Sequence, residues 1–319
     1  MAGLENARGR SKIRYLPFGQ IYPTMGKKGK RGDKPAEKKA ILKRIDALAK
    51  KLEEELKGAD LFAPLPPMDD CPICLVRLPR MDNSKLYQGC CGKYICFACF
   101  KENYRVIEKM NGLIKGGAEK KKIESACPFC REPDPIGGKY LRQLEFRGLR
   151  GDAHAYSLLG IHYGFTMDGK RRDRTRALQY FIQATELGSE DACAAISSFL
   201  NEGTAGIPVD KITARLFCTV AALRGHIQAR HKIGCFEYAV GNHELGIRHW
   251  KISANAGYQD SLNRLRDIFN ADGKLPGKEF VGKEELDTLY RKCHDVQKEV
   301  KSEEREKYLT EEDKRCAWY

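Results

Sequence analysis

The sequence predicts a small zinc-stabilised α+β module followed by an all-α solenoid of helix pairs, with one separate helix before the module. Two observations support this fold class. Eight cysteines lie in four close pairs between positions 71 and 130 of the 319-residue chain, and no histidine precedes His154. Beyond position 140, small and apolar residues recur with a period of 37. Clustered cysteine pairs are typical of zinc sites, and a fixed period near this length is typical of stacked helix pairs.

Residues 1–35 form a basic arm. Residues 1–34 contain nine lysines or arginines and two acidic residues, a difference of +7. The arm is a disordered tail, a nuclear localisation signal or a nucleic-acid-binding segment. The N-terminus has no apolar signal region, and no apolar stretch approaches the length of a membrane span. We therefore expect a cytoplasmic or nuclear protein with no membrane partner.

Residues 36–60 have the pattern of an amphipathic helix. Ile41, Ile45, Leu48 and Leu52 recur at steps of four and three, with Lys and Glu between them. The pattern covers two to three heptads, which is short for a coiled coil. The helix either mediates dimerisation or docks on a neighbouring domain. A proline-rich spacer then leads into residues 68–135.

Residues 68–135 contain the four cysteine pairs. They are Cys71/Cys74, Cys90/Cys91, Cys96/Cys99 and Cys127/Cys130. A C-x-x-C loop lets two thiolates reach one ion, and eight thiolates complete two closed tetrahedral Zn²⁺ sites. A closed site has no open position for substrate, so we expect both ions to be structural. In a reducing compartment such cysteines bind metal rather than form disulfides.

The segment 140–270 repeats. The repeating positions are Ala155/Ala192/Ala229, Leu159/Ile196/Ile233, Asp173/Asp210 and Ala177/Ala214. Each repeat closes on Gly188, Gly225 or Gly257, where a left-handed backbone ends a helix. The last glycine interval is 32, so the third unit has lost five residues, which we assign to its inter-helix loop. A partial fourth copy follows, and residues 280–315 read as a charged helix that caps the stack.

The cysteine pattern resembles the RING finger. In that fold the first and third pairs bind one zinc ion, and the second and fourth pairs bind the other. The resemblance implies one site of Cys71, Cys74, Cys96 and Cys99, and another of Cys90, Cys91, Cys127 and Cys130. RING fingers have C-x-H at the second pair, whereas Lys93 occupies that position here, and an ammonium group cannot bind a metal. Either both adjacent cysteines are ligands, or one is a spectator and Asp82 replaces it or the site is empty.

RING fingers commonly recruit ubiquitin-conjugating enzymes. The usual groove has an apolar residue inside the first pair, a proline inside the last and an arginine after it. Ile73, Pro128 and Arg131 stand at these positions, and Phe100 or Tyr104 would complete the groove. The resemblance implies a RING-type E3 ubiquitin ligase that works by positioning, without a covalent intermediate. The alternative is a non-catalytic zinc-binding adaptor.

The repeats resemble the Sel1-like repeat, a relative of the tetratricopeptide repeat. The first copy carries the resemblance at Leu159-Gly160, Tyr163, Gly169, Asp173, Ala177, Ala184 and Gly188. The third copy departs from the pattern because it lacks the aspartate and the loop glycines, which leaves its loop geometry open. Sel1-like repeats act as adaptors, so the resemblance implies a surface for a protein substrate or another protein partner.

Overall fold

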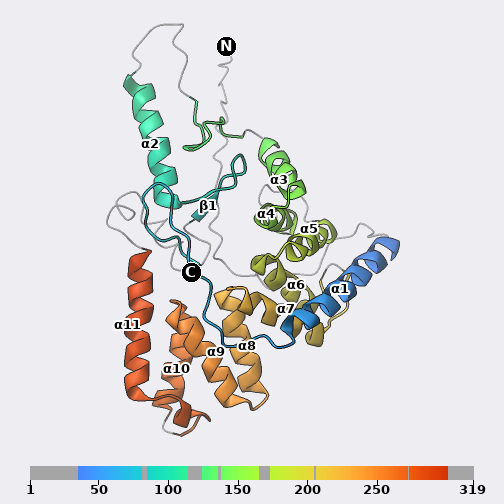
Figure 1. Cartoon of the computed structure of the whole chain (residues 1–319), viewed down its shortest axis with the longest axis vertical. Coiled ribbons are helices and arrows are strands. Elements are labelled where there is room, and N and C mark those ends of the chain that lie inside the picture. The colour runs from blue at the N-terminus through green and yellow to red at the C-terminus, as the bar shows by residue number, and fades with distance from the viewer. Residues whose placement is uncertain are drawn as a thin grey trace, which may run out of the picture.

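The computed structural model describes residues 35–80, 85–113, 124–135, 138–164, 173–204, 206–271 and 273–300. Residues 1–34 of the basic arm, Asp82, Gly169 and residues 301–315 of the expected charged helix lie outside these ranges. The elements are α1 (Pro35–Leu56), β1 (Lys85–Tyr87), β2 (Tyr94–Cys96), α2 (Phe97–Leu113), α3 (Lys139–Leu149), α4 (Ala153–Gly164), α5 (Arg174–Glu186), α6 (Glu190–Glu202), α7 (Lys211–Leu223), α8 (Ile227–Ala239), α9 (His243–Asn255), α10 (Gln259–Asn270), the 3₁₀ helix η2 (Lys278–Phe280) and α11 (Lys283–Glu299). The fold is therefore mostly helical, with one small sheet near the cysteines (Figure 1).

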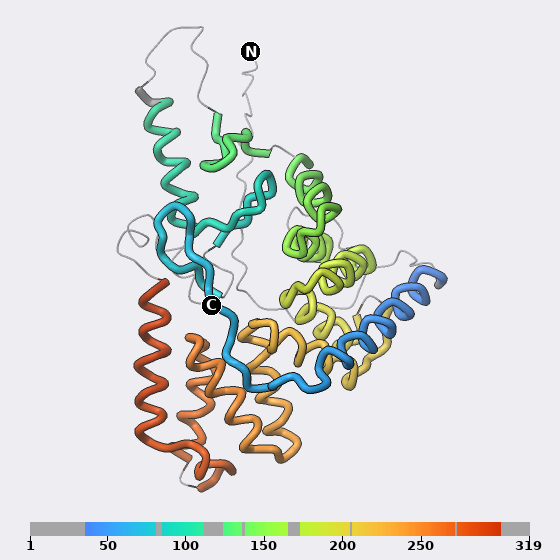
Figure 2. The backbone as a smooth tube through the Cα atoms, in the orientation of Figure 1, coloured from blue at the N-terminus to red at the C-terminus, as the bar shows by residue number. Residues whose placement is uncertain are grey.

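Helices α3 to α10 form a solenoid that follows a curved path (Figure 2). Its most extensive contacts join α4 to α5, α6 to α7 and α8 to α9. The repeating positions lie where these helices meet, and none is more than 3% exposed: Ala155, Ala192, Ala229, Leu159, Ile196, Ile233, Ala177 and Ala214. Ser261 and Leu265 of the partial fourth copy are fully buried as well. The period read from the sequence is therefore the period of the packed core.

The closing glycines end their helices as predicted. Gly188, Gly225 and Gly257 have φ values of 98°, 109° and 92°. In each turn, the glycine donates its N–H to the carbonyl three residues back, and the next residue donates to the carbonyl five residues back. This pattern satisfies carbonyl groups that the end of a helix leaves free. Gly151, which sequence analysis did not single out, makes the same turn 37 residues before Gly188.

The loops on the other side of the solenoid explain the shortened third unit. Asp173 and Asp210, 37 residues apart, are the N-caps of α5 and α7, and their carboxylates accept backbone N–H groups there. Asn242 holds the same place before α9 but makes no side-chain cap bond. The loop before α7 has eight residues, 203–210, and the loop before α9 has three, 240–242. The five missing residues are therefore in the inter-helix loop, as predicted.

Helix α1 docks on the solenoid, so the structure shows the docked form of the two interpretations. Ile41, Ile45, Leu48 and Leu52 are each at most 5% exposed and share one hydrophobic cluster with the solenoid. The helix contacts α5 and α7. At the other end of the stack, α11 packs on α9 and α10 as a cap.

Burial lowers the pKa values of three histidines of the solenoid, His226, His231 and His249. Nδ1 of His231, on α8, forms a hydrogen bond of 2.8 Å with the hydroxyl of the buried Ser261. Burial, reinforced by the nearby cations Arg264 and Lys232, lowers its pKa to about 4, although Asp260 opposes this shift. In the unfolded chain its pKa returns to about 6.5. Between these values the unfolded state binds more protons, so the stabilisation is complete above pH 6.5 and is lost as the pH falls toward 4.

We predict that His231→Gln reduces the loss of stability between pH 7 and pH 5. The reduction should be about 1 kcal/mol, a value discounted because His231 is only partly buried. Urea unfolding of the wild type and the variant, followed by circular dichroism at both pH values, measures it. The same loss in both proteins would contradict the assignment to His231.

Candidate metal centre

Two backbone turns of the same geometry present the first and last cysteine pairs. In the first turn, Leu75 donates its N–H to the carbonyl of Cys71 at 2.8 Å. In the second, Arg131 donates to the carbonyl of Cys127 at 3.1 Å. Leu75 and Arg131, each directly after its C-x-x-C, have φ values of 58° and 62°. A non-glycine residue in this region costs about 1–3 kcal/mol, so the surrounding turn must hold the backbone there.

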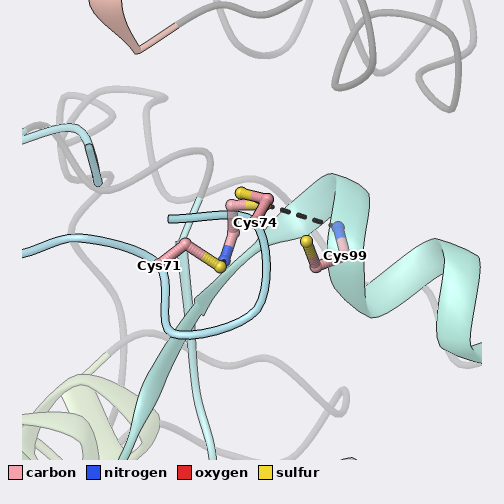
Figure 3. A group of neighbouring side chains, drawn as sticks. Cys71, Cys74 and Cys99 are labelled. Atoms are coloured by element: carbon pink, nitrogen blue, oxygen red, sulfur yellow. Dashed lines mark hydrogen bonds between the residues drawn. The ribbon is translucent and has the colours of Figure 1, made fainter. Parts of the chain in front are cut away.

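A short hairpin brings the middle two pairs between these turns. Strand β1 pairs antiparallel with β2, and the connection between them carries Cys90 and Cys91. Strand β2 ends at Cys96 and runs directly into α2, which places Cys99 in the first turn of that helix (Figure 3).

The eight thiols gather into two groups of four, in which the pairs interleave. One group is Cys71, Cys74, Cys96 and Cys99, and the other is Cys90, Cys91, Cys127 and Cys130. Within each group all sulfur atoms lie within 4.8 Å of one another. The Sγ atoms of Cys74 and Cys96 are 3.9 Å apart, and those of Cys91 and Cys127 are 3.8 Å apart. A tetrahedron with Zn–S bonds of about 2.3 Å has edges of about 3.8 Å, so these distances suit one zinc ion per group.

Backbone N–H groups lower the pKa of one thiol in each group. Burial acts to raise the pKa of Cys71, but amide donors outweigh it and bring the pKa to about 7. The donors are the N–H groups of Cys96, Cys74 and Ile73, and the first lies 3.4 Å from the sulfur. The pKa of Cys127 is lowered in the same way by its own turn, against the effect of burial.

The remaining shifts disfavour the thiolate form of Cys90, Cys91 and Cys99. Burial raises the pKa values of Cys90 and Cys99, and the neighbouring thiolates raise them further. Burial and Cys127 also raise the pKa of Cys91, despite an N–H donated by Lys93. A divalent cation would offset this repulsion. Each group could hold a metal ion, and its donor set is consistent with zinc.

Lys93, which the RING resemblance aligns with a ligand histidine, makes a different contact. Its ammonium lies 4.7 Å from the centre of the Phe129 ring, a cation–π contact inside the module. Within the described residues, no carboxylate joins the group of Cys90 and Cys91. The alternative ligand Asp82 lies outside the described residues.

The residues expected to contact a conjugating enzyme lie at the two turns. Ile73 is 43% exposed, Arg131 is exposed and Pro128 is half-buried. Phe100 packs against the small core of the module. Sequence analysis missed Leu75, which is 76% exposed beside Ile73. The sequence feature that could have identified Leu75 is an apolar residue directly after the first C-x-x-C.

Tyr104 forms a hydrogen bond inside the module that carries the cysteines. Its hydroxyl donates to the carboxylate of Asp134, which also accepts a hydrogen bond from Ser125. This bond ties α2 to the segment that follows the last cysteine pair, so Tyr104 supports the shape of the module.

Side chains join the zinc module to both ends of the helical stack. At the first end, Tyr87 of β1 donates to Asp152, and Arg147 donates to the same carboxylate at 2.9 Å. Burial acts to raise the pKa of Asp152, but these bonds keep it below its usual value. At the other end, Arg77 lies 3.7 Å from the carboxylate of Glu299 on α11. Sequence reasoning missed these contacts because no local pattern marks them.

Within the described ranges, none of the helices is both long enough and apolar enough to span a bilayer.

Comparison with known proteins gives partial similarities. No family model matches the chain. Over 120 residues the chain is 27% identical to chitin synthase regulatory factor 4 of Schizosaccharomyces pombe, covering 38% of this chain and 19% of that protein. Among solved structures, a Sel1 repeat protein from Oxalobacter formigenes is 22% identical, with a TM-score of 0.43, covering 52% of this chain and 66% of that one. The protective antigen c5321 of uropathogenic Escherichia coli, described as an SLR fold, is 15% identical, with a TM-score of 0.40, covering 56% and 47%.

Proposed function

We propose that the chain is a RING-type E3 ubiquitin ligase whose zinc module binds two Zn²⁺ ions and recruits a ubiquitin-conjugating enzyme. The observation that supports this most is the interleaving of the four cysteine pairs, which leaves Ile73 and Arg131 exposed on two matching turns. The zinc ions would hold these turns in place. Because every thiol of the two groups would bind metal, the protein would carry no covalent ubiquitin.

Arg131 is the residue that we expect to promote transfer. A guanidinium group is planar and always charged, so it can bridge two carbonyl or carboxylate groups of its partners at once. Bridging the conjugating enzyme and ubiquitin would hold the thioester in its reactive geometry, and positioning of this kind accelerates a reaction without new chemistry. Arg131 has a positive φ, a strained backbone conformation that normally favours glycine. Strain of this kind is frequent at functional sites, which supports a role for the Arg131 side chain.

The solenoid would bind the protein substrate. Stacked helix pairs offer extended surfaces for protein partners, and the buried columns support a Sel1-like repeat. The 120-residue similarity to a chitin synthase regulatory factor also supports a role in regulation by binding. It favours a second candidate, a non-catalytic zinc-binding adaptor. In both cases we place the protein in the cytoplasm or nucleus, where thiols remain reduced.

A ubiquitin-discharge assay with Arg131→Gly tests the ligase proposal. We expect the wild type to discharge ubiquitin from at least one enzyme of a broad panel, and the variant to lose about tenfold or more of that rate. Glycine accepts the positive φ of this position, so the variant should keep its fold and its two zinc ions. Arg266→Ala, which removes an exposed arginine from α10, is the matched control and should discharge ubiquitin like the wild type.

Two results would contradict the proposal. If the wild type contains both zinc ions but discharges ubiquitin from no enzyme of the panel, the protein is a non-catalytic adaptor. If the wild type is active and Arg131→Gly discharges ubiquitin at the same rate, Arg131 has no part in positioning.

A further inference from the structure

Residues 57–67, which we call the strap, leave α1 and run along the solenoid to the zinc module (Figure 2). The carboxylate of Asp60 accepts the backbone N–H of Phe62 at 2.9 Å, which turns the chain toward α9. The ring of Phe62 lies 4.9 Å from the ring of His249. The guanidinium of Arg248 covers the same phenyl ring at 3.7 Å. The strap therefore places one aromatic side chain against an imidazole ring and a guanidinium group of the solenoid.

A buried arginine holds the strap beside this aromatic contact. Arg230 on α8 is 1% exposed and donates one hydrogen bond to the carbonyl of Leu61. It donates another to the carbonyl of Ala222 at 3.0 Å. Among the described residues no carboxylate forms an ion pair with it, and burial lowers its pKa to about 10. A guanidinium that is so fully removed from water normally has an anionic partner.

Two buried polar atoms remain unsatisfied under the strap. Neither Nε of Arg230 nor Nδ1 of His249 has a hydrogen-bond partner among the described residues. Both side chains contact strap residues 61 and 62, so the strap fits the shape of this site but satisfies only part of its hydrogen-bonding capacity. A carboxylate at this place would supply the missing acceptor and the missing negative charge.

The charges on the two sides of the contact are complementary. On the solenoid side, Arg224, Arg230 and Arg248 line the path of the chain. On the other side, Glu55 pairs with Arg224 at 2.9 Å, and Asp60 is the acid whose field acts on Arg230. Glu55 belongs to the end of α1, whereas the strap itself carries one acid, Asp60, and one base, Lys57. The solenoid therefore binds an extended segment with an aromatic residue and one carboxylate, and its own chain provides one.

We infer that this site recognises an extended peptide from another protein that carries an aromatic residue and a carboxylate, and that the strap is the internal competitor of that peptide. The inference specifies the partner class of the protein-binding solenoid in the proposed function and does not depend on ubiquitin transfer. A tethered segment competes at an effective concentration on the order of millimolar. A peptide partner would therefore bind only weakly until the strap is loosened.

A labelled synthetic peptide of residues 57–67 tests the inference on the full chain. We expect the peptide to bind Phe62→Ala at least about tenfold more tightly than it binds the wild type, because the internal competitor is weakened. A peptide with alanine in place of its phenylalanine should lose that binding. Fluorescence anisotropy measures both effects without any ubiquitin component.

Three further variants test whether a change in peptide affinity is specific to the site under the strap. Phe146→Ala removes a 58% exposed ring from α3 and should bind the peptide no better than the wild type. Asp60→Ala alters an exposed strap residue, so it loosens the strap even if Phe62→Ala fails to fold. Adding Arg230→Met to the Phe62→Ala or Asp60→Ala variant should abolish its gain in peptide affinity.

Three results would overturn the inference. The first is equal peptide affinity for the wild type and both loosened variants. The second is a gain in affinity that survives Arg230→Met. The third is concentration-dependent dimerisation of the loosened chains with no gain in peptide binding, because the site would then accept a second copy of the chain.

Discussion

Replacing Cys91 with serine is expected to remove the zinc ion of its own group and to destabilise the rest of the module. The core of this module is small, with only Cys71, Leu78, Ile95, Cys96 and Ala98 buried in its cluster among the described residues. A structural zinc ion contributes about 10–16 kcal/mol of binding free energy, far more than such a core can supply. Elemental analysis should fall from two zinc ions per chain to one. Amide hydrogen exchange between residues 70 and 135 should become fast.

Cys90→Ser should have the same effect, because both adjacent thiols lie in the second group. Cys193→Ser is the matched control. Burial raises the pKa of Cys193 to about 11, so it remains a neutral thiol inside the solenoid, and its variant should retain both ions. If either Cys90→Ser or Cys91→Ser also retains two ions, that cysteine is a spectator and the second site has another ligand.

Shortening Ile45 to alanine is expected to lower the free energy of unfolding by about 3 kcal/mol. Ile45 is 1% exposed and belongs to the hydrophobic cluster that includes Phe181 of α5 and Phe217 of α7. Removing its outer carbons would leave a cavity between α1 and the solenoid, because well-packed helices collapse only partly around a vacancy. Urea denaturation of the full chain measures the loss.

Lys50→Ala, an exposed substitution on the same helix, should change stability by less than about 0.5 kcal/mol. The dimerisation alternative gives a different result. If α1 buried Ile45 against a second copy, the unfolding midpoint of the wild type would rise with protein concentration. A midpoint independent of concentration, together with a large loss for Ile45→Ala, supports the docked helix.

The repeats could be predicted in detail because their determinants are local and periodic. Ala155, Ala192 and Ala229 are small where helices approach each other, and the closing glycines mark left-handed turns. Even the length of the third loop followed from the shortened glycine interval. Each of these features depends on a few neighbouring residues, which a sequence displays directly.

The contacts between the modules could not be predicted in this way. Tyr87 and Asp152 lie 65 residues apart, and Arg230 meets the carbonyl of Leu61 across 169 residues. Neither pair belongs to a repeat, and tyrosine, aspartate and arginine are common on surfaces, so nothing local distinguished them. The positive φ values of Leu75 and Arg131 could not be predicted either, because neither position is a glycine.

The position of the zinc module between the two ends of the stack has a mechanical consequence. An open array of helix pairs bends easily, since each pair touches only its neighbours and small rotations add up along it. Here Tyr87 meets one end of the array and Arg77 the other, so the module acts as a strut across the arc. With metal bound to both cysteine groups as proposed, the span of that arc would depend on a part of the protein whose rigidity comes from those ions. Metal supply would then govern the width of a surface to which neither cysteine group belongs.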